Sequence, residues 1–340
     1  MNRALVIQTA FLGDVILTLP LVQVLKRTNS QLMIDFVAIP AAKEVLANHP
    51  DISNVIIYDK HGDQKSLFAF SELGRLLRAN KYDLVLCPHP SFRSSVMARA
   101  TKAGVRIGFD RSAWKNNFTS ILPWRFGVHE IDRNLSLLRP LGIDAARELP
   151  RLYPSDSDRE KANAFMKLNG IAGRFAVVAP GTVWKTKQFP VRKMAEVADK
   201  LRGKFERVVL VGGVNDSGAN DDFSDADNYV VSAIGQLPIM SSAEIIRRAS
   251  LLISNDSAPV HIASAFSVPT VAIFGPTVRD FGFYPYHDKS AVVEVKNLSC
   301  RPCSIHGGKN CPIETFDCME MIQSDDVATV AFLLTGGGNV

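Results

Sequence analysis

The chain has 340 residues, 46% of them apolar and 21% charged, which is a composition typical of globular proteins and long enough for about two domains. This composition excludes an intrinsically disordered chain, a collagen-like fibre and a small disulfide scaffold. The net charge of +5 is too small for this length to indicate nucleic-acid binding. Residues 1–150 carry 19 Lys and Arg against 13 Asp and Glu, whereas residues 151–340 carry 20 against 21, so we expect the halves to bind different ligands.

The longest apolar stretch, Ala4–Leu25, begins close to the N-terminus. It contains Asp14 and Pro20, and a charge at the centre of a membrane span would be unfavourable. Asp14 also interrupts what would be the uncharged core of a secretory signal. The sequence therefore predicts neither a membrane span nor a secretory signal, and we expect a cytoplasmic protein.

Short β-branched runs alternate with amphipathic stretches, the pattern of βαβ units on a parallel sheet. In the first half the expected strands and helices are Ala4–Ile7, Val15–Arg27, Leu32–Val37, Ala41–Asn48, Leu84–Cys87 and Ser94–Lys102. In the second half they are Arg159–Asn169, Phe175–Ala179, Val191–Lys204, Arg207–Val211, Ala243–Ala249, Leu251–Ser254, Val260–Ala265 and Thr270–Phe274.

The alternation predicts an α/β protein of two Rossmann-like, doubly wound parallel-sheet domains. The polar, Pro-containing segment Glu148–Asp158 suits a linker, so we place the domains at 1–155 and 156–340. Ligands bind at the carboxyl ends of the strands in such sheets, and two facing domains would form one central cleft.

The turn between the first strand and first helix, residues 9–14, is the first candidate site. Gly13 permits a tight backbone, and Asp14 begins an apolar helix whose dipole stabilises the carboxylate by about 0.3–1 kcal/mol. At the carboxyl end of a strand this carboxylate would face a ligand. A helix N-cap is the structural alternative, although Ser or Thr could serve equally well as a cap in this uncharged stretch.

The second candidate is the turn Ala179-Pro180-Gly181-Thr182, which Lys185 and Lys187 follow. Backbone amides, the Thr182 hydroxyl and a lysine suit a diphosphate, although both lysines could be solvated surface charges. The second Gly of a Walker motif is missing, so magnesium-dependent nucleotide hydrolysis is not indicated. The absence of Gly-x-Gly-x-x-Gly argues against a nicotinamide dehydrogenase.

The third candidate, Asn255–His261, follows an apolar strand and opens a helix. Its short polar residues before Pro259 are also typical of an ordinary helix start. Asp256, Ser257 and His261 could place hydrogen-bonding groups around a phosphate or a ribose, although a lone histidine here is more often structural.

Six landmarks span nearly the whole chain: Phe11–Asp14, Arg106–Asp110, His129-Glu130 with Arg133-Asn134, Pro180-Gly181 through Lys187 and Pro190, Asn255–His261, and Phe274–Thr277. On these landmarks the chain resembles the ADP-heptose:lipopolysaccharide heptosyltransferases, glycosyltransferase family 9, and is most like heptosyltransferase II. The resemblance implies the GT-B fold, with the acceptor in the N-terminal domain and ADP-heptose in the C-terminal domain. It also implies inverting transfer without an obligatory metal or other cofactor.

The resemblance also implies roles for individual residues. Asp14 matches the catalytic base, and Lys187 matches the lysine that contacts the diphosphate of the donor. Asp256, Ser257 and His261 match the nucleotide-site loop.

Two further donor positions follow from the same resemblance. Ala258 stands where the family usually has Gly, and Asp216 is the nearest match to an acidic ribose contact. Together with Gly181 and Thr182, these residues complete the expected donor site.

The acceptor side follows from charge. Seven basic residues and one acidic residue lie between Ser91 and Arg125, which suits an anionic acceptor such as lipid A with its phosphates and Kdo carboxylates. The same charge would draw the protein to the anionic inner-membrane leaflet, at about 1 kcal/mol per well-placed residue. A solvated basic surface is the alternative. The residues assigned to the acceptor are Gly13, Arg93, Arg106 and Arg111.

Four of the five cysteines are crowded near the C-terminus: Cys300, Cys303, Cys311 and Cys318. Four thiolates could hold a structural zinc ion or an iron–sulfur cluster. The spacing fits no standard zinc finger, so reduced structural cysteines are the favoured interpretation, with a disulfide as a further alternative.

Two other function classes remain open at the sequence level. A GT-B enzyme with another reaction, such as a nucleotide-sugar epimerase, would share the fold but would not need a basic acceptor surface. An inactive sugar-nucleotide binder could also keep the fold, and the presence of Asp14 and Lys187 argues against it.

Overall fold

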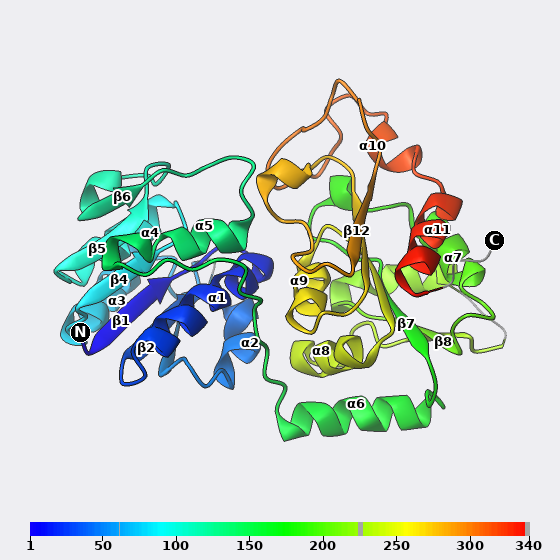
Figure 1. Cartoon of the computed structure of the whole chain (residues 1–340), viewed down its shortest axis with the longest axis horizontal. Coiled ribbons are helices and arrows are strands. Elements are labelled where there is room, and N and C mark those ends of the chain that lie inside the picture. Colours follow the sequence, from blue (N-terminus) through cyan, green and yellow to red (C-terminus); the bar gives the residue numbers. More distant parts are fainter. Residues whose placement is uncertain (61, 224–226, 337–340) are drawn as a thin grey trace. The chain divides into compact units, whose positions relative to one another are not determined.

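The computed structural model describes residues 1–60, 62–223 and 227–336. The chain divides into two compact domains, Met1–Arg151 and Leu152–Val340, each with its own six-stranded sheet (Figure 1). The division falls inside the polar segment that the sequence suggests as a linker.

The first domain is a parallel sheet with helices on both faces. Its strands are β1 (Arg3–Ile7), β2 (Met33–Ala38), β3 (Asn54–Ile57), β4 (Leu84–Cys87), β5 (Val105–Phe109) and β6 (Ser120–Leu122). Its helices are α1 (Leu12–Thr28), α2 (Lys43–Ala47), α3 (Leu67–Ala79), α4 (Phe92–Ala100) and α5 (Glu130–Ser136), with short 3-10 helices η1 (Pro40–Ala42), η2 (Lys115–Asn117) and η3 (Arg139–Leu141).

The second domain has the same kind of architecture. Its strands are β7 (Phe175–Ala179), β8 (Arg207–Leu210), β9 (Val230–Ser232), β10 (Leu251–Asn255), β11 (Thr270–Phe274) and β12 (Ser290–Glu294). Its helices are α6 (Asp156–Leu168), α7 (Val191–Lys200), α8 (Ile239–Arg248), α9 (Ala258–Ala265), α10 (Asp317–Glu320) and α11 (Ser324–Leu334), with 3-10 segments η4 (Lys185–Lys187), η5 (Val214–Phe223) and η6 (Arg279–Phe281).

The two sheets share one strand order. It is β3-β2-β1-β4-β5-β6 in the first domain and β12-β11-β10-β7-β8-β9 in the second, with every strand pair parallel. In both sheets the order reverses beside the first strand of the domain, between β1 and β4 and between β7 and β10. Ligands bind at this reversal in doubly wound sheets, at the carboxyl ends of the strands.

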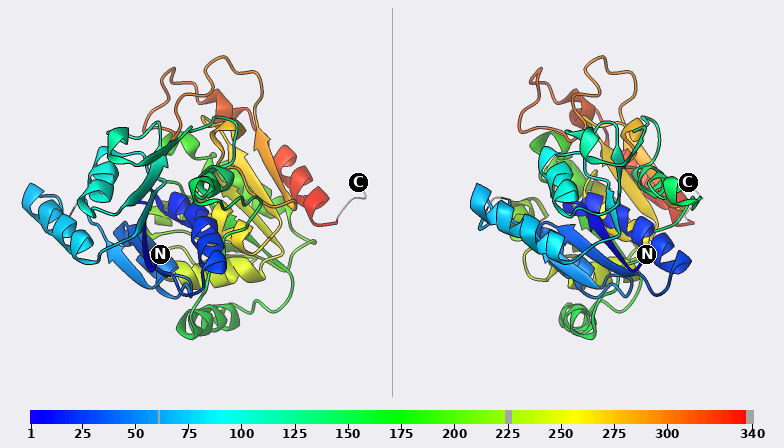
Figure 2. Two further views of the ribbon diagram at one scale, coloured as in Figure 1. Left: turned by 60° about the vertical axis from the view of Figure 1, so that its left-hand side comes forward. Right: turned by 90° about the vertical axis from the view of Figure 1, so that its left-hand side faces the viewer.

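Apolar side chains fill the space between each sheet and its helices. In the first domain Leu73 of α3 and Met97 of α4 are buried with residues of β1, β2 and β4. In the second domain Met194 of α7 and Val327 of α11 pack with residues of β7 and β10. Helices α8 and α9 lie on the opposite face of that sheet from α7 and α11, and α11 runs beside β12 (Figure 2).

The polar segment between the domains ends in a capping box, which explains where α6 begins. The Ser155 hydroxyl accepts a hydrogen bond from the Asp158 N–H at 3.1 Å, and the Asp158 carboxylate accepts one from the Ser155 N–H at 2.9 Å. These contacts satisfy backbone donors that a helix start leaves unpaired. The helix therefore begins at Asp156, slightly earlier than the sequence predicts.

Several strands lie where the sequence predicts them, including β4, β7 and β11. The sequence did not indicate the outer strands β3, β6, β9 and β12 or the helices α3, α5 and α11. Among the described residues, no helix has both the length and the apolar character that a membrane span requires.

Candidate functional site

A cavity of about 520 Å³ opens at the carboxyl ends of the central strands of the second domain. It lies where the strand order reverses, between the segments that follow β7 and β10. Five residues that the sequence assigned to the donor site line it together: Gly181, Thr182, Asp216, Ser257 and Ala258. Its size is within the range of about 300–1,000 Å³ for small-molecule sites.

The lining of this cavity is part apolar and part polar. The apolar part is lined by Val183, Val211, Leu237, Ile239, Ile246 and Ile262. The polar part includes Ser257 and the first turn of α9, where the helix dipole favours an anion. This arrangement suits a ligand with a flat apolar body and a negatively charged group.

Asn255, at the end of β10, connects the segments that border the cavity. Its side-chain amide donates to the Pro180 carbonyl at 2.8 Å, and its side-chain oxygen accepts a hydrogen bond from the Phe189 N–H at 3.0 Å. The residue is completely buried, so both bonds are shielded from water. Asn255 thereby fixes the turn after β7 and the end of the Lys187 segment, a role that the sequence did not reveal.

Gly181 lies directly against the carboxylate of Asp216. A Cβ atom at position 181 would stand 2.1 Å from the Asp216 carboxyl group, far inside van der Waals contact. The same carboxylate accepts a hydrogen bond from the Gly213 N–H at 2.8 Å, which holds it in place. The close approach explains why this turn requires a residue without a side chain.

Lys187 does not line the cavity but forms an ion pair beside it. Its ammonium group lies 2.7 Å from Oδ2 of Asp256, and the Thr277 hydroxyl donates to the same oxygen at 2.7 Å. The sequence predicted that Asp256 lies in the nucleotide-site loop; its carboxylate is occupied by Lys187 and Thr277. Asp256 thus orients Lys187.

His261 is buried in α9 and does not line the cavity. Burial lowers the pKa of its imidazole to about 4, the nearby Asp256 opposes this shift, and Lys187 adds to it. The ring is therefore neutral at neutral pH. Its Nδ1 has no hydrogen-bond partner among the described residues, and the assignment of His261 to the nucleotide-site loop stays a prediction.

In the first domain, Asp14 is the third residue of α1 and Gly13 the second. The Asp14 carboxylate accepts a hydrogen bond from the Phe11 N–H at 3.2 Å, so it caps its own helix. It is partly exposed, at the edge of the sheet where β1 ends. The capping role and a role toward a ligand are compatible, because a carboxylate can accept several hydrogen bonds at once.

Glu130, at the start of α5, is a buried neighbour of Asp14. In the sequence it served only as one of the landmarks of the family resemblance. It forms an ion pair with Arg133. Burial raises the pKa of Glu130 to about 7; the Asp14 charge adds to the shift, whereas Arg133 and Arg111 oppose it. The Asp14 turn therefore has a second carboxyl group beside it that titrates near neutral pH.

The three arginines assigned to the acceptor lie in different environments. Arg111 follows β5, and its guanidinium stacks 4.5 Å from the centre of the Trp124 ring. Arg93 donates to the Tyr58 hydroxyl at 2.7 Å.

Arg106 lies at the opposite end of the strand from the ligand-binding edge. It stands near the start of β5, and its guanidinium donates to the backbone carbonyls of Asn117 and Ala103. Partial burial lowers its pKa. These contacts brace the backbone, so the geometry does not support the acceptor contact expected from the sequence.

A polar cluster follows β1 and β4, where the strand order of the first sheet reverses. Nδ1 of His89 lies 2.9 Å from the Thr9 hydroxyl and 2.9 Å from the Ser94 hydroxyl. The ammonium of Lys60 donates to the Thr9 carbonyl at 3.3 Å. The sequence missed this cluster, because its members are distant in the chain.

The cysteine-rich segment packs on the turn that carries Lys187. Gly308 donates its N–H to the Thr186 hydroxyl at 2.7 Å, and Cys303 donates its N–H to the Pro276 carbonyl at 3.1 Å. The five cysteines are free thiols. Within the described parts of the chain, no three His, Cys, Asp or Glu side chains are arranged to hold a metal ion, so the zinc alternative has no support.

With this geometry established, the comparisons with known proteins are informative. The sequence model of the family described as Glycosyltransferase family 9 (heptosyltransferase) matches residues 70–313. The chain belongs to glycosyltransferase family 9. The enzyme class and the GT-B fold predicted from the sequence are thereby confirmed, and the protein is a glycosyltransferase.

Similar proteins support the assignment to glycosyltransferase family 9. The chain is 29% identical over 287 residues to lipopolysaccharide heptosyltransferase 3 of Escherichia coli, covering 80% of this chain and 83% of that protein. The solved family 9 glycosyltransferase of Veillonella parvula superposes with a TM-score of 0.87 at 25% identity, covering 98% and 97% of the two chains. The E. coli heptosyltransferase WaaC with ADP has the same fold, with a TM-score of 0.75, 18% identity and coverage of 98% and 99%.

Proposed function

We propose that this family 9 enzyme transfers a heptose from ADP-heptose to the inner core of lipopolysaccharide, with Kdo-lipid A or heptosyl-Kdo-lipid A as the acceptor. The cavity at the strand reversal of the second domain is the observation that carries the donor assignment. The names of the relatives support a heptose as the transferred sugar and lipopolysaccharide as the class of acceptor.

The cavity suits the nucleotide part of such a donor. Its apolar wall would contact the adenine ring, and Asp216 is available to a ribose hydroxyl. The backbone at Gly181 and Thr182 and the first turn of α9 would face the diphosphate. Lys187 would then supply positive charge as ADP departs, because a cation beside the leaving group stabilises the transition state.

Asp14 is the proposed general base. The acceptor hydroxyl oxygen forms a bond to the anomeric carbon while the bond from that carbon to the diphosphate oxygen breaks. The hydroxyl proton passes to the Asp14 carboxylate, and ADP leaves with the bonding electron pair. One displacement of this kind inverts the anomeric configuration.

The charge of the first domain supports an anionic acceptor. Residues 1–150 carry a net charge of +6, whereas the rest of the chain carries −1. We infer that the first domain binds the acceptor while in peripheral contact with the anionic cytoplasmic leaflet of the inner membrane. The second domain binds the donor in this proposal.

The test measures ADP release from ADP-heptose with and without Kdo-lipid A. Transfer predicts release that depends on the acceptor and a glycolipid product heavier by one heptose. Acceptor-independent consumption of the nucleotide sugar would indicate another GT-B reaction. Binding of ADP without any turnover would indicate a sugar-nucleotide binder.

A further inference from the structure

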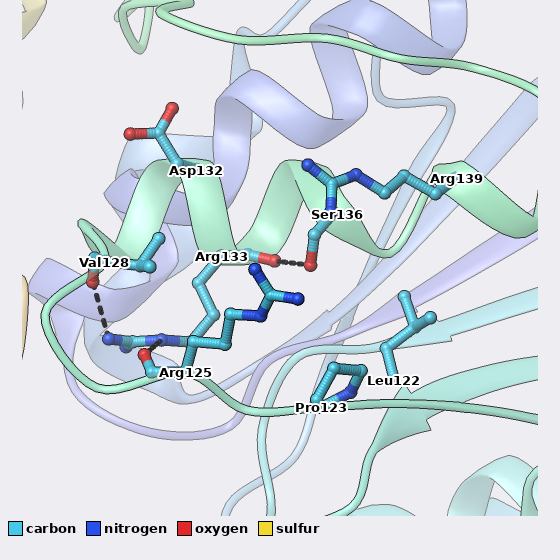
Figure 3. Close-up of a pocket in the computed structure, with 8 residues that line it drawn as sticks. All are labelled: Leu122, Pro123, Arg125, Val128, Asp132, Arg133, Ser136 and Arg139. Carbon is cyan, nitrogen blue, oxygen red and sulfur yellow. Dashed lines mark hydrogen bonds between the residues drawn. The ribbon is translucent and has the colours of Figure 1, made fainter.

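A second, smaller cavity of about 110 Å³ lies in the first domain, between the segment that follows β6 and the outer face of α5 (Figure 3). Three arginines are among its lining residues, which are Leu122, Pro123, Arg125, Val128, Asp132, Arg133, Ser136 and Arg139. None of them is among the residues individually assigned to the acceptor from the sequence, although Arg125 ends the basic stretch that begins at Ser91. The cavity is too small for a nucleotide but has room for a single small anionic group.

Two of the arginines have guanidinium groups that are available to a ligand. Figure 3 shows Arg125 and Arg139 reaching toward Ser136 from different sides. Arg125 has no ion pair in the described part of the chain, and the only one for Arg139 is a long contact of 3.8 Å to the exposed Asp144. Guanidinium groups that converge on one space and have no close ion-pair partner favour a planar or tetrahedral oxyanion.

The third arginine, Arg133, shapes the cavity. Its guanidinium is paired with Glu130, and it also donates to the carbonyls of Val128 at 2.6 Å and Arg125 at 3.2 Å. These bonds hold the segment that carries Arg125 against α5. The cavity is therefore preformed, which reduces the entropy lost on binding.

Asp132, the acidic residue of the lining, does not neutralise the charges of Arg125 and Arg139. Asp132 accepts a hydrogen bond from the Arg147 N–H at 3.4 Å. In Figure 3 its carboxylate is turned away from the space between Arg125 and Arg139. The Ser136 hydroxyl donates its hydrogen to the Arg133 carbonyl, so the donors that face an oxyanion are the N–H groups of Arg125 and Arg139.

Helix α5 connects this cavity to the Asp14 turn. Asp132 and Ser136 lie one turn apart on the cavity side, and Asn134 points to the other side, where it donates to the Leu17 carbonyl of α1 at 3.2 Å. Strand β6 ends at Leu122, so the cavity stands at the same edge of the parallel sheet as the turn after β1. A ligand held here would lie on the edge that carries Asp14.

We propose that the cavity between Arg125 and Arg139 binds an oxyanion of the acceptor, a phosphate or a carboxylate, beside Ser136. The assignment of this oxyanion to the acceptor rests on the proposed function. Binding of a free oxyanion does not, so the two can be tested separately.

The first experiment uses the full chain and inorganic phosphate or acetate as probes. The Nε–H signals of Arg125 and Arg139, assigned with Arg125→Gln and Arg139→Gln, should shift in NMR spectra with saturation during the titration. A control pair, Arg75→Gln with Arg78→Gln, removes two exposed arginines of the same domain outside the cavity and should leave this shift intact. Unchanged Arg125 and Arg139 signals at saturating phosphate and acetate would overturn the proposal.

The second experiment measures acceptor kinetics with the Arg125→Gln/Arg139→Gln variant. The KM for the acceptor should rise about tenfold or more, since a charge-assisted contact is lost at each position, while kcat and ADP affinity stay within twofold. Repeating the kinetics with dephosphorylated acceptor and with carboxylate-esterified acceptor identifies the source. Wild type and variant should differ least on the acceptor that lacks the recognised group.

The outcomes are distinguishable. An equal rise in KM for the control pair, or the same variant effect on every acceptor, would overturn the acceptor assignment. If the wild type transfers to no acceptor, the proposed function fails, and the phosphate titration still decides whether the cavity binds an oxyanion.

Discussion

The ammonium group of Lys187 and the carboxylate of Asp256 form an ion pair of 2.7 Å beside the cavity of the second domain. Only 12% of the Lys187 side chain and 5% of the Asp256 side chain are exposed. An ion pair with this little solvent contact is screened weakly by salt and holds its lysine in one orientation. The lysine proposed to contact the diphosphate is therefore oriented before the donor binds.

Lys187→Ala should weaken ADP binding by about 10- to 100-fold, because one charge-assisted contact contributes roughly 1.5–3 kcal/mol. Calorimetric titration with ADP measures this. Lys185→Ala is the matched control, since Lys185 opens the same short 3-10 helix but is exposed. Equal ADP affinity in wild type and Lys187→Ala would remove Lys187 from the donor site.

Asp14→Asn should lower kcat by about 100-fold or more, because the amide cannot accept the proton from the acceptor hydroxyl. The side-chain oxygen of Asn can still accept the hydrogen bond from the Phe11 N–H, so α1 should keep its start. ADP affinity and melting temperature serve as controls and should change little. A variant that retains most of its turnover would leave Asp14 with a capping role alone.

Gly181→Ala should disturb the donor site through Asp216. The new Cβ would stand 2.1 Å from the Asp216 carboxyl group and push it off the Gly213 N–H. We expect a loss of about 1–3 kcal/mol in stability from overpacking and a parallel loss of ADP affinity. Gly218→Ala is the control, because a Cβ there meets no atom within 4 Å. Similar behaviour of the two variants would show that the site tolerates a side chain at position 181.

The sequence predicted the interior of both sheets better than their edges. The strands β7, β10 and β11 are buried along their whole length and consist mostly of apolar residues, because helices cover both faces of the sheet, and such segments are conspicuous in a sequence. Strands β6 and β9 have only three residues, and α5 is rich in polar residues. Whether these elements form depends on their packing against a neighbouring strand or helix. A local sequence pattern does not contain that information.

The donor and acceptor sites also divide into residues that a local pattern reveals and residues whose environment depends on tertiary packing. Gly181 and Thr182 could be proposed as site residues because they lie just after a strand, and the parallel sheet brings strand ends to one edge, whereas Ala258 was assigned through the family resemblance. The environment of Arg106 could not be predicted, because it depends on carbonyl groups brought close by the fold. The convergence of Arg125 and Arg139 depends likewise on how α5 packs.

Glu130 should make stability fall as pH rises toward neutrality. Its pKa is raised from 4.5 to about 7 in the folded protein, so between these values the unfolded chain loses the proton while the folded protein keeps it. The contribution of the Glu130 proton to the free energy of unfolding is fully present below pH 4.5 and is lost as the pH rises toward 7. Urea unfolding across this range measures the slope.

Glu130→Gln should flatten this slope, because the variant has no proton to lose at this position. Glu72→Gln is the control, since Glu72 pairs with Arg75 on the exposed surface and should leave the slope unchanged. Identical slopes in wild type and Glu130→Gln would mean that Glu130 is ionised throughout, held so by Arg133.

Salt should weaken acceptor binding more than donor binding. The first domain has a net charge of +6, and its exposed arginines would meet an anionic acceptor in water, where charges are screened over about 10 Å at 0.1 M salt. Lys187 is nearly buried and paired, so its contact with ADP should respond less. We therefore expect the KM for the acceptor to rise more steeply with salt than the dissociation constant of ADP.

Arg111→Gln should reduce the acceptor slope, because the Arg111 guanidinium lies at the ligand-binding edge, stacked on Trp124. Steady-state kinetics and ADP titrations provide both slopes. They should cover about 0.05 to 0.5 M salt, a range over which the Debye length falls from more than about 10 Å to a few ångströms. Parallel slopes for acceptor and ADP, unchanged in Arg111→Gln, would show that the basic surface is solvated and takes no part in acceptor binding.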